Sequence, residues 1–308
     1  MCKKYLTPDI FIIPRLEDIV VSSQHTRSQT GLRRVDLTLR AESTFPVPYS
    51  DGYSVYGALL DALDSVDADV SQRVHDAPLG SVHSSGLLGP FGDSDRDYHK
   101  SVRNGEQYQL SLGIIDPSDI EIFQALVNAV VLEGDSLELS HGSLHVEAFE
   151  SENETHEELL ARASRADDPT LEVRFRTPTC IEEAGDVTTM FPHRVPVFTS
   201  LLGKWNRTAP EKLEFDLSRE DIAGNVLEKP DPGRYDTHSV LVSRGETDDD
   251  ETRSIMKQGF TGVCEYAFKD ASESVENAVT TLALFGGYSG VGSAVARGCG
   301  TVSVELGD

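Results

Sequence analysis

The spacing of hydrophobic and polar positions divides most of the chain into short strands and amphipathic helices. Apolar residues recur at every second position in some stretches and at every third to fourth position in others, which are the periods of strands and helices. The pattern predicts a strand at 33–40, helices at 52–63 and 67–75, strands near 81–87 and at 108–112, a helix at 117–130, and strands at 137–139 and 144–149. This order is β-α-β-β-α-β, the ferredoxin-like arrangement.

The same order recurs more loosely in the rest of the chain. The pattern here predicts a strand at 171–179, a helix at 196–205, strands at 213–217, 238–242 and 262–268, a helix at 275–285 and a final strand at 301–306. We therefore predict an α+β fold of two tandem ferredoxin-like domains, at 33–152 and 166–308, joined by a helix at 157–163. Residues 1–32 contain only short apolar runs and are predicted to be a peripheral extension.

A glycine-rich segment, residues 286–300, lies between the last predicted helix and the final strand. Glycine takes positive φ easily and lets the backbone approach a ligand closely, and successive bare N–H groups in such a loop bind anions. Neither a dinucleotide-binding motif nor a P-loop fits the order of elements and the residues that follow the glycines. RNA is then the leading ligand. The alternative is a tight helix-to-strand turn with no ligand.

Charge and cysteine content bear on the cellular setting. The 308 residues carry a net charge of -25, whereas proteins that grip nucleic acid are normally basic. Because the carboxylates are spread over the whole chain, we predict a halophilic protein in a cytoplasm of very high salt; an acidic protein with a basic partner is the alternative. No apolar run is long enough to cross a membrane. The four cysteines lack C-x-x-C spacing, which excludes a zinc knuckle or a thioredoxin-like motif. Neither a metal nor another cofactor is expected.

Three sets of motifs carry a resemblance to a known family. They are Val47-Pro48-Tyr49 with Tyr53 to Leu60, Val74-His75-Asp76 and Ser84 to Leu87; Phe175 to Thr179 with Val197 to Leu202 and Trp205-Asn206; and Gly262-Val263 with Gly290-x-Gly292 and Gly298-x-Gly300. Over roughly residues 33–308 the chain resembles the CRISPR-associated endoribonucleases of the Cas six type, which cut repeat transcripts into guide RNAs. The resemblance implies two ferredoxin-like domains, CRISPR repeat RNA bound along their shared cleft, and cleavage without a metal.

The resemblance also implies roles for individual residues. In many members a histidine after the first helix is catalytic, and that position matches His75. The assisting tyrosine of the family is replaced by Leu60, so a tyrosine on a preceding turn, Tyr56, is the candidate helper. A lysine found in some members has no counterpart between His75 and Gly89, and His83 stands there instead. The candidate catalytic residues are therefore His75, Tyr56 and His83.

Cleavage of RNA without a metal needs an acid, a base and donors for the phosphate. Histidine suits both proton-transfer roles because its pKa is ~6.5, and a positioned acid or base contributes ~10²–10⁴-fold. Attack by the 2′-hydroxyl would leave a 2′,3′-cyclic phosphate and a 5′-hydroxyl. The candidate RNA-binding residues are Gly290, Gly292, Ser293, Arg297, Gly298, Gly300 and Ser85, with Arg73, Arg174, Arg176, Arg194, Lys204 and Arg207 as further candidate contacts to the RNA backbone.

Two other functions stay open on the sequence alone. A non-catalytic RNA-binding subunit of a CRISPR interference complex is favoured by the absent lysine and the displaced tyrosine. An acidic scaffold protein would leave the glycine-rich segment unexplained. For an RNA-processing protein the expected partners are the repeat RNA and other CRISPR-associated subunits, with no membrane.

Overall fold

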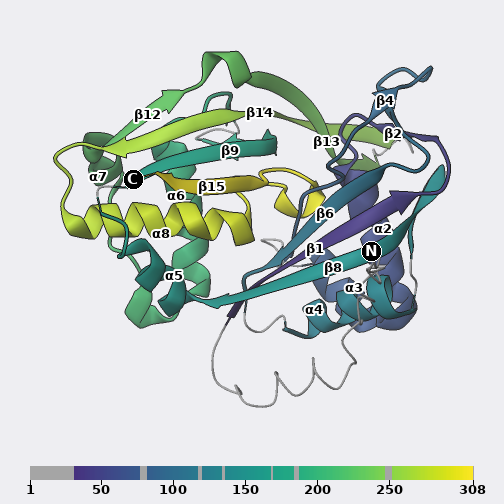
Figure 1. The fold of residues 1–308 in the computed structure, drawn as a ribbon, viewed down its shortest axis with the longest axis horizontal. Coiled ribbons are helices and arrows are strands. Elements are labelled where there is room, and N and C mark those ends of the chain that lie inside the picture. The colour runs from purple at the N-terminus through teal and green to yellow at the C-terminus, as the bar shows by residue number, and fades with distance from the viewer. Residues whose placement is uncertain are drawn as a thin grey trace, which may run out of the picture. The chain divides into compact units, whose positions relative to one another are not determined.

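The computed structural model describes residues 31–76, 82–116, 120–133, 136–167, 169–183, 187–246 and 252–307. They belong to one unit that begins at Gly31, so the predicted extension at 1–32 lies outside the described residues except for its last two positions. Helices and strands are mixed along this unit, and the predicted α+β class is confirmed (Figure 1). We call residues 31–155 the N-terminal half and residues 156–307 the C-terminal half.

The N-terminal half is built on a five-stranded antiparallel sheet. Its strands lie in the order β3 (Val82–Ser84), β6 (Gln107–Ile114), β1 (Gly31–Ala41), β8 (Gly142–Thr155) and β7 (Ser136–Leu139). The connections are α2 (Gly52–Val66), α3 (Ala68–Asp76), and α4 (Ile120–Val127) with a π-helical turn (Asn128–Glu133). A small sheet contains β2 (Phe45–Pro48), β5 (His99–Val102) and β4 (Gly92–Asp93). With β7 and the small sheet set aside, the elements follow the order β-α-β-β-α-β.

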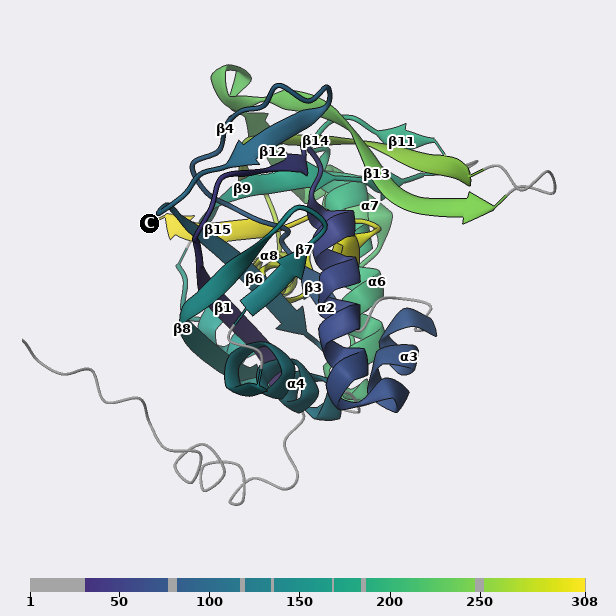
Figure 2. The same ribbon diagram turned by 90° about the vertical axis from the view of Figure 1, so that its right-hand side faces the viewer.

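The alternation in β1 explains how this sheet is covered. Leu37 of β1 is paired with Leu110 of β6 and is fully buried. On α2, Val55, Leu59 and Leu63 recur at helical spacing and are buried in the same core. Burying a side chain of this kind stabilises the fold by about 1.5–3 kcal/mol. The core therefore fixes α2, and with it α3, which packs beside α2 (Figure 2).

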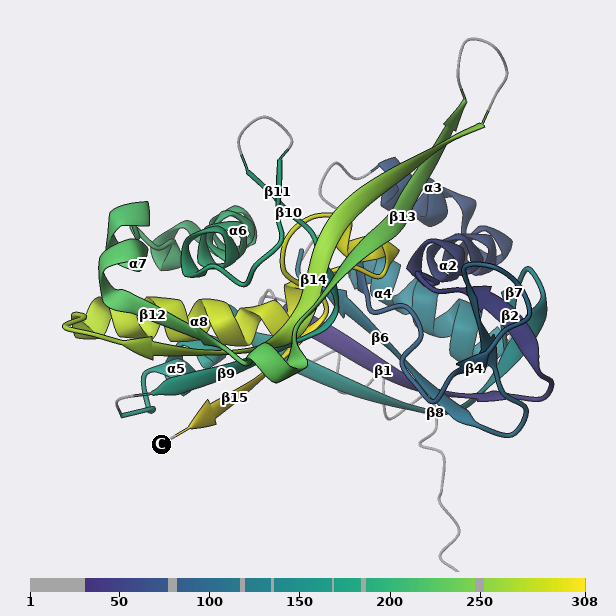
Figure 3. The ribbon, with the colours of Figure 1, turned by 90° about the horizontal axis from the view of Figure 1, so that it is seen from above.

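The C-terminal half repeats this order on a second antiparallel sheet. Its strands lie in the order β12 (Val226–Pro230), β14 (Thr252–Phe268), β9 (Thr170–Thr179) and β15 (Val302–Gly307), and β13 (Asp236–Glu246) pairs with β14. Its helices are α5 (His156–Ala163), α6 (Arg194–Thr208), α7 (Arg219–Asn225) and α8 (Glu273–Ser289). Shorter pieces are β10 (Ile181–Glu182), β11 (Thr188–Thr189) and 3₁₀ turns at Glu211–Leu213, Pro232–Arg234 and Val295–Arg297. Figure 3 shows β13 and β14 as a long hairpin that extends beyond the sheet.

The strand predicted at 213–217 is wrong, and the second strand of this half is β12 instead. Residues 211–213 form a 3₁₀ turn, and the backbone of Phe215 bonds to the amide side chain of Asn206 in both directions, at 2.9 Å each. The ring of Phe215 also stacks on Trp205. The apolar alternation of this stretch therefore serves packing against α6, not pairing in a sheet.

Glycines allow the two halves to meet at close range. A Cβ on Gly298 would lie 2.5 Å from the Cα of Gly52, and the converse distance is the same. A Cβ on Gly113 of β6 would lie 2.0 Å from the carbonyl oxygen of Tyr288 on α8. These contacts place the N-terminus of α2 directly against the glycine-rich segment.

Candidate functional site

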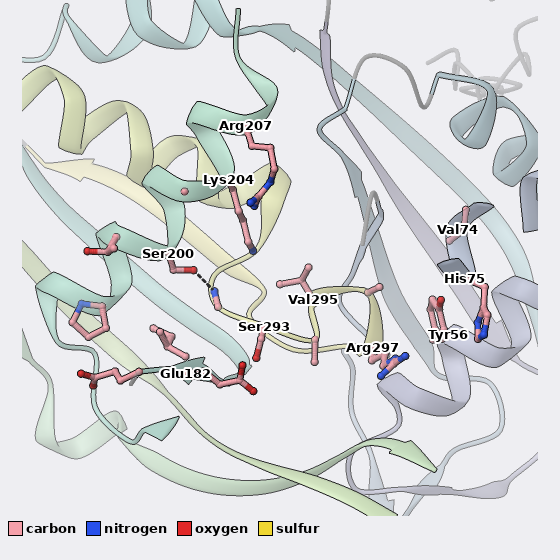
Figure 4. Close-up of a pocket in the computed structure, with 18 of the residues that line it drawn as sticks. Tyr56, Val74, His75, Glu182, Ser200, Lys204, Arg207, Ser293, Val295 and Arg297 are labelled. Carbon is pink, nitrogen blue, oxygen red and sulfur yellow. Dashed lines mark hydrogen bonds between the residues drawn. The ribbon is translucent and has the colours of Figure 1, made fainter. Parts of the chain in front are cut away.

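A cavity of about 920 Å³ lies where α2 and α3 of the N-terminal half meet α6 and the glycine-rich segment of the C-terminal half (Figure 4). Tyr56 and His75 line it from one side, and Ser200, Lys204 and Arg207 line it from the other. Residues 292–297 lie between these two groups. The cavity thus brings together segments that are more than 200 residues apart in the sequence.

The lining of this cavity is richer in positive than in negative side chains. Its acidic members are Glu182 and Glu183. Its basic members are His75, Lys204, Arg207, Arg219 and Arg297. Arg207 and Arg219 have no ion-pair partner among the described residues. On a chain with a net charge of -25, this cluster of cations is an attractive place for a polyanion.

His75 stands at the C-terminal end of α3. Its neighbour Val74 is buried and anchors the helix, whereas His75 itself is exposed. Among the residues that the structure describes, none forms a hydrogen bond with the His75 ring, so both ring nitrogens can meet a ligand. A helix C-terminus also favours a cationic side chain. His75 therefore has the position and the freedom that a proton carrier needs.

Tyr56 lies next to His75 on the neighbouring helix, and Arg297 lies across from it on the glycine-rich segment (Figure 4). The guanidinium carbon of Arg297 is 5.7 Å from the centre of the Tyr56 ring, within the range of a cation–π contact. Arg297 also donates from Nη1 to the carbonyl oxygen of Val242 at 2.7 Å. Tyr56 is 92% buried, so the ring chiefly holds Arg297 in place at the cavity wall.

The other two side chains that the sequence singles out in the N-terminal half are internal. His83 is buried, not on the surface as a strand-edge histidine would be, and its Nε2 lies 3.1 Å from Oγ1 of Thr301. Burial, followed by the nearby charges of Lys204 and Arg34, lowers the pKa of His83 to about 3. Ser85 is also buried, and its Oγ donates to the carbonyl oxygen of Gly86 at 2.7 Å. Neither lines the cavity.

Four glycines of the segment are required by the protein's own packing. Positive φ angles occur at Gly290, Gly292, Gly298 and Gly300. At Gly292, where φ is 81°, a Cβ would lie 2.3 Å from the carbonyl oxygen of Cys180. A side chain at this position would therefore meet both backbone strain and a collision.

Most of the amides in this segment already have acceptors within the protein. Gly292 N donates to Oγ of Ser200 at 3.0 Å, and Ser293 N donates to the carbonyl oxygen of Cys180 at 2.7 Å. Gly300 N donates to the carbonyl oxygen of Pro178 at 3.0 Å. The expectation of a row of bare N–H groups is wrong for these residues, because β9, the residue after it and α6 satisfy them. The segment therefore forms part of the cavity wall, and the polar side chains that it contributes there are Ser293 and Arg297.

Lys204 holds the end of α8 in place. Its Nζ donates to the carbonyl oxygens of Ser289 and Gly290, at 3.1 and 2.8 Å. These carbonyls end the helix, where its dipole favours a cation. Burial, followed by Arg207, lowers the pKa of Lys204 to about 7. A phosphate in the cavity would favour the charged form again.

Several candidate cations of the sequence lie elsewhere, and two polar cavity residues, Ser200 and Arg219, had not been identified. Arg73, Arg174 and Arg194 form ion pairs with glutamates. Arg176 does not line the cavity, whereas Lys204 and Arg207 do. Ser200 was missed, although Ser200, Lys204 and Arg207 follow the i, i+4, i+7 spacing of a single helical face. That polar face on an otherwise apolar helix was the available signal.

Among the residues that the structure describes, no group of three or more histidine, cysteine or acidic side chains could hold a metal ion. Within the same part of the chain, no helix is long and apolar enough to span a membrane.

Comparison with known proteins shows which family part of the chain resembles and which solved structures share its fold. Residues 173–302 match the family model of the CRISPR-associated endoribonuclease Cas6. A Cas6 from Thermus thermophilus has a similar structure, with a TM-score of 0.63, 18% identity, and coverage of 90% of this chain and 99% of that one.

A Cas6 product complex gives a TM-score of 0.64 at 20% identity, covering 90% of this chain and 100% of that one. The product of a Cas6-related gene of Pyrococcus furiosus gives 0.57 at 12% identity, covering 89% and 98%. No curated protein sequence matches this chain. Residues 173–302 therefore resemble the Cas6 family of CRISPR-associated endoribonucleases, and the chain shares the fold of solved Cas6 structures.

Proposed function

We propose that the protein cleaves CRISPR repeat transcripts into guide RNAs at the cavity between the two halves. The observation that carries this proposal is the exposed His75, which faces a cationic wall in a chain that resembles the Cas6 family. Similar structures include Cas6 complexes with a product and with a substrate mimic, and a related protein that binds different RNA substrates. In this proposal the two halves are tandem ferredoxin-like domains, at 33–152 and 166–308, an inference supported by the strand orders of their sheets.

The proposed reaction is attack by a 2′-hydroxyl on the adjacent phosphorus. A base takes the proton of the hydroxyl, the oxygen–phosphorus bond forms, and the bond to the 5′-oxygen breaks as that oxygen receives a proton from an acid. The products are a 2′,3′-cyclic phosphate and a 5′-hydroxyl, and no metal takes part. His75 is the residue that exchanges a proton at the cut, because an imidazole can serve as acid or base and this one is exposed at the cavity.

The cations of the cavity have a different part in this scheme. Arg297 is held near His75 by Tyr56 and Val242, so its remaining donors are available for the phosphate that carries the developing charge. Arg207 and Arg219 lie on the side of the cavity that Lys204 also lines, where they would bind the RNA backbone. His83 is no longer a candidate for direct proton transfer, because it is buried and away from the cavity.

A labelled cognate repeat incubated with the protein in the presence of a chelator tests this function. We expect a single cut, a 2′,3′-cyclic phosphate on the upstream product, and no reaction when the nucleotide at the cut carries a 2′-deoxyribose. Dependence of cleavage on a divalent metal would contradict the proposed chemistry.

One observation favours the second candidate, a non-catalytic RNA-binding subunit. His75 is the single histidine among the described residues that line the cavity, so the partner acid or base is not evident. The same experiment separates the two functions: a protein that binds the repeat tightly without cutting it is the binding subunit.

A further inference from the structure

A second cavity, of about 670 Å³, lies beside α2 in another part of the molecule. Whereas Tyr56 lines the first cavity, Tyr53, Ser54 and Gly57 of the same helix line this one. Its other walls come from β2, the turn after β7, and β13. No residue lines both cavities, so the second cavity is a separate site.

Two tyrosines with largely exposed rings are sequence neighbours of residues that line this cavity. Tyr49 is 66% exposed and Tyr98 is 85% exposed, although burial of such rings is normally favourable. Tyr49 N donates to the carbonyl oxygen of Tyr98 at 3.0 Å, so the two positions are fixed beside each other. Pro48 and His99, their neighbours in the sequence, line the cavity and pair across β2 and β5. Tyr49 and Tyr98 therefore lie beside the cavity.

Tyr98 also has a strained backbone. Its φ is 59°, a conformation that is an outlier for a bulky residue. Such strain costs about 1–3 kcal/mol and persists only where the surrounding structure enforces it. Here the strained turn is held by the backbone bond to Tyr49, and it presents an aromatic ring to solvent.

The polar lining is mixed in charge. It includes Arg96 and Arg244, the imidazoles of His99 and His141, and the carboxylates of Asp61 and Glu138. Arg96 contacts His141, whereas Arg244 has no hydrogen-bond or ion-pair partner among the described residues. His99 donates from Nδ1 to the carbonyl oxygen of Asp97 at 2.7 Å, which leaves Nε2 for a ligand. Asp95 and Asp97 of the same turn add negative charge beside the site.

These groups together suit unpaired nucleobases better than a row of phosphates. Aromatic faces stack on bases, guanidinium groups contact the RNA backbone, and carboxylates accept hydrogen bonds from exocyclic amines. A duplex would present only its outer edges and its phosphates, which the carboxylates would repel. The exposed tyrosines would stay unused by such a ligand.

We propose that this second cavity binds a single-stranded segment of RNA, with bases stacked on Tyr49 and Tyr98. The inference rests on the proposed function in one respect, namely that the RNA is part of the transcript that the first cavity cuts. The second cavity would then set how tightly a transcript is held, and not how fast it is cut.

Binding of a short, unstructured, fluorescein-labelled oligoribonucleotide to the whole protein tests this site. We expect the double variant Tyr49→Ala, Tyr98→Ala to bind roughly 5- to 100-fold more weakly for each stacked base that is lost. The matched control is Tyr49→Phe, Tyr98→Phe, which keeps both rings and should bind as the wild type does. Tyr98→Asn removes one ring in a residue that tolerates positive φ, so the chain stays folded at this turn.

Two further readouts locate the effect. An oligoribonucleotide that contains 4-thiouridine should crosslink to the turn that carries Tyr98 and not to the glycine-rich segment. With the full repeat transcript, the double alanine variant should raise KM and leave kcat unchanged. Unchanged RNA binding by the double alanine variant overturns the site, as would happen if the tyrosines dock a protein subunit instead. Weak binding by the phenylalanine variant also overturns it, because stacking needs only the ring.

Failure of this inference is distinguishable from failure of the proposed function. If the wild-type protein cuts the repeat and the alanine variant binds short RNA as tightly as the wild type does, the proposed function stands and the second site is refuted. If the wild-type protein binds short RNA through the tyrosines but cuts no repeat, the proposed function is refuted and the second site stands.

Discussion

The end of α3 and the glycine-rich segment line the same cavity, and they are built in opposite ways. His75 is exposed, and no described residue restrains its ring. The glycine-rich segment is fixed by its contacts with Cys180, Ser200 and Gly52. The comparison teaches that the feature most visible in the sequence has a structural role, while the proposed chemistry depends on one side chain with few contacts. The two regions should therefore respond differently to substitution.

Replacing His75 by Ala should separate cleavage from folding most sharply. We expect the cleavage rate to fall about 10²-fold or more, because a positioned acid or base contributes that much. RNA binding and the melting temperature should change little, because binding is spread over several cations and His75 is exposed. Single-turnover cleavage, RNA affinity and thermal melting measure the three quantities. Cleavage at the wild-type rate would remove His75 from the mechanism.

Replacing Gly292 by Val should instead destabilise the fold. Positive φ costs a non-glycine residue about 1–2 kcal/mol, and overpacking against Cys180 adds about 1–3 kcal/mol. Gly287→Ala is the matched control, because nothing lies within 4 Å of its Cβ position and alanine is the better helix former. Denaturant unfolding of both variants measures the difference. An equally stable Gly292→Val protein would show that the segment is not tightly packed.

Much of the fold could be predicted from the sequence because it depends on local periodicity. The alternation in β1 and the apolar faces of α2 and α8 are visible without a structure. The strand predicted at 213–217 was wrong, because the Asn206 side chain makes hydrogen bonds to the backbone of this stretch, and such a tertiary contact is not visible in the local pattern. β12 was missed, because its pattern is short and mixed.

The candidate site was predicted in part, for a similar reason. His75, Lys204, Arg207 and Arg297 were named from the sequence, and the structure places all four at one cavity. His83 was named too, but its burial depends on packing between the halves, which no local pattern reports. The backbone amides of the glycine-rich segment are a second example, because several of their acceptors also lie in distant parts of the sequence. Glycine content reveals that a backbone is unusual, and it does not reveal whether a ligand or the protein itself requires this.

His83 offers a pH test of the contact between the halves. Its folded pKa, about 3, lies below the unfolded value of 6.5, so the unfolded chain binds more protons between these values. The contribution of His83 is therefore fully present above pH 6.5 and is lost as the pH falls toward 3. A difference of one pKa unit corresponds to about 1.4 kcal/mol. The free energy of unfolding should therefore fall by about 2 kcal/mol between pH 7 and pH 5 because of His83.

The variant His83→Gln isolates this effect from the titration of carboxylates. Glutamine can still bond to Thr301 but does not titrate, so its unfolding free energy should fall less on acidification than that of the wild type. Denaturant unfolding at pH 7 and pH 5 gives the difference of slopes. Equal slopes would mean that His83 is already protonated in the folded protein at pH 5.

Salt should have the smallest and most widely distributed effect, and it should act in opposite directions on the surface and on the first cavity. The net charge of -25 repels itself across the molecule, and the Debye length falls from ~10 Å at 0.1 M to ~3 Å at 1 M. We expect the melting temperature to rise by a few degrees over this range, as about 1 kcal/mol of relieved repulsion would produce. RNA held by Lys204, Arg207 and Arg297 should bind more weakly over the same range, because salt competes with phosphate contacts. A melting temperature that falls with salt would contradict the prediction of a halophilic protein, while RNA affinity that rises with salt would contradict the assignment of these cations to phosphate.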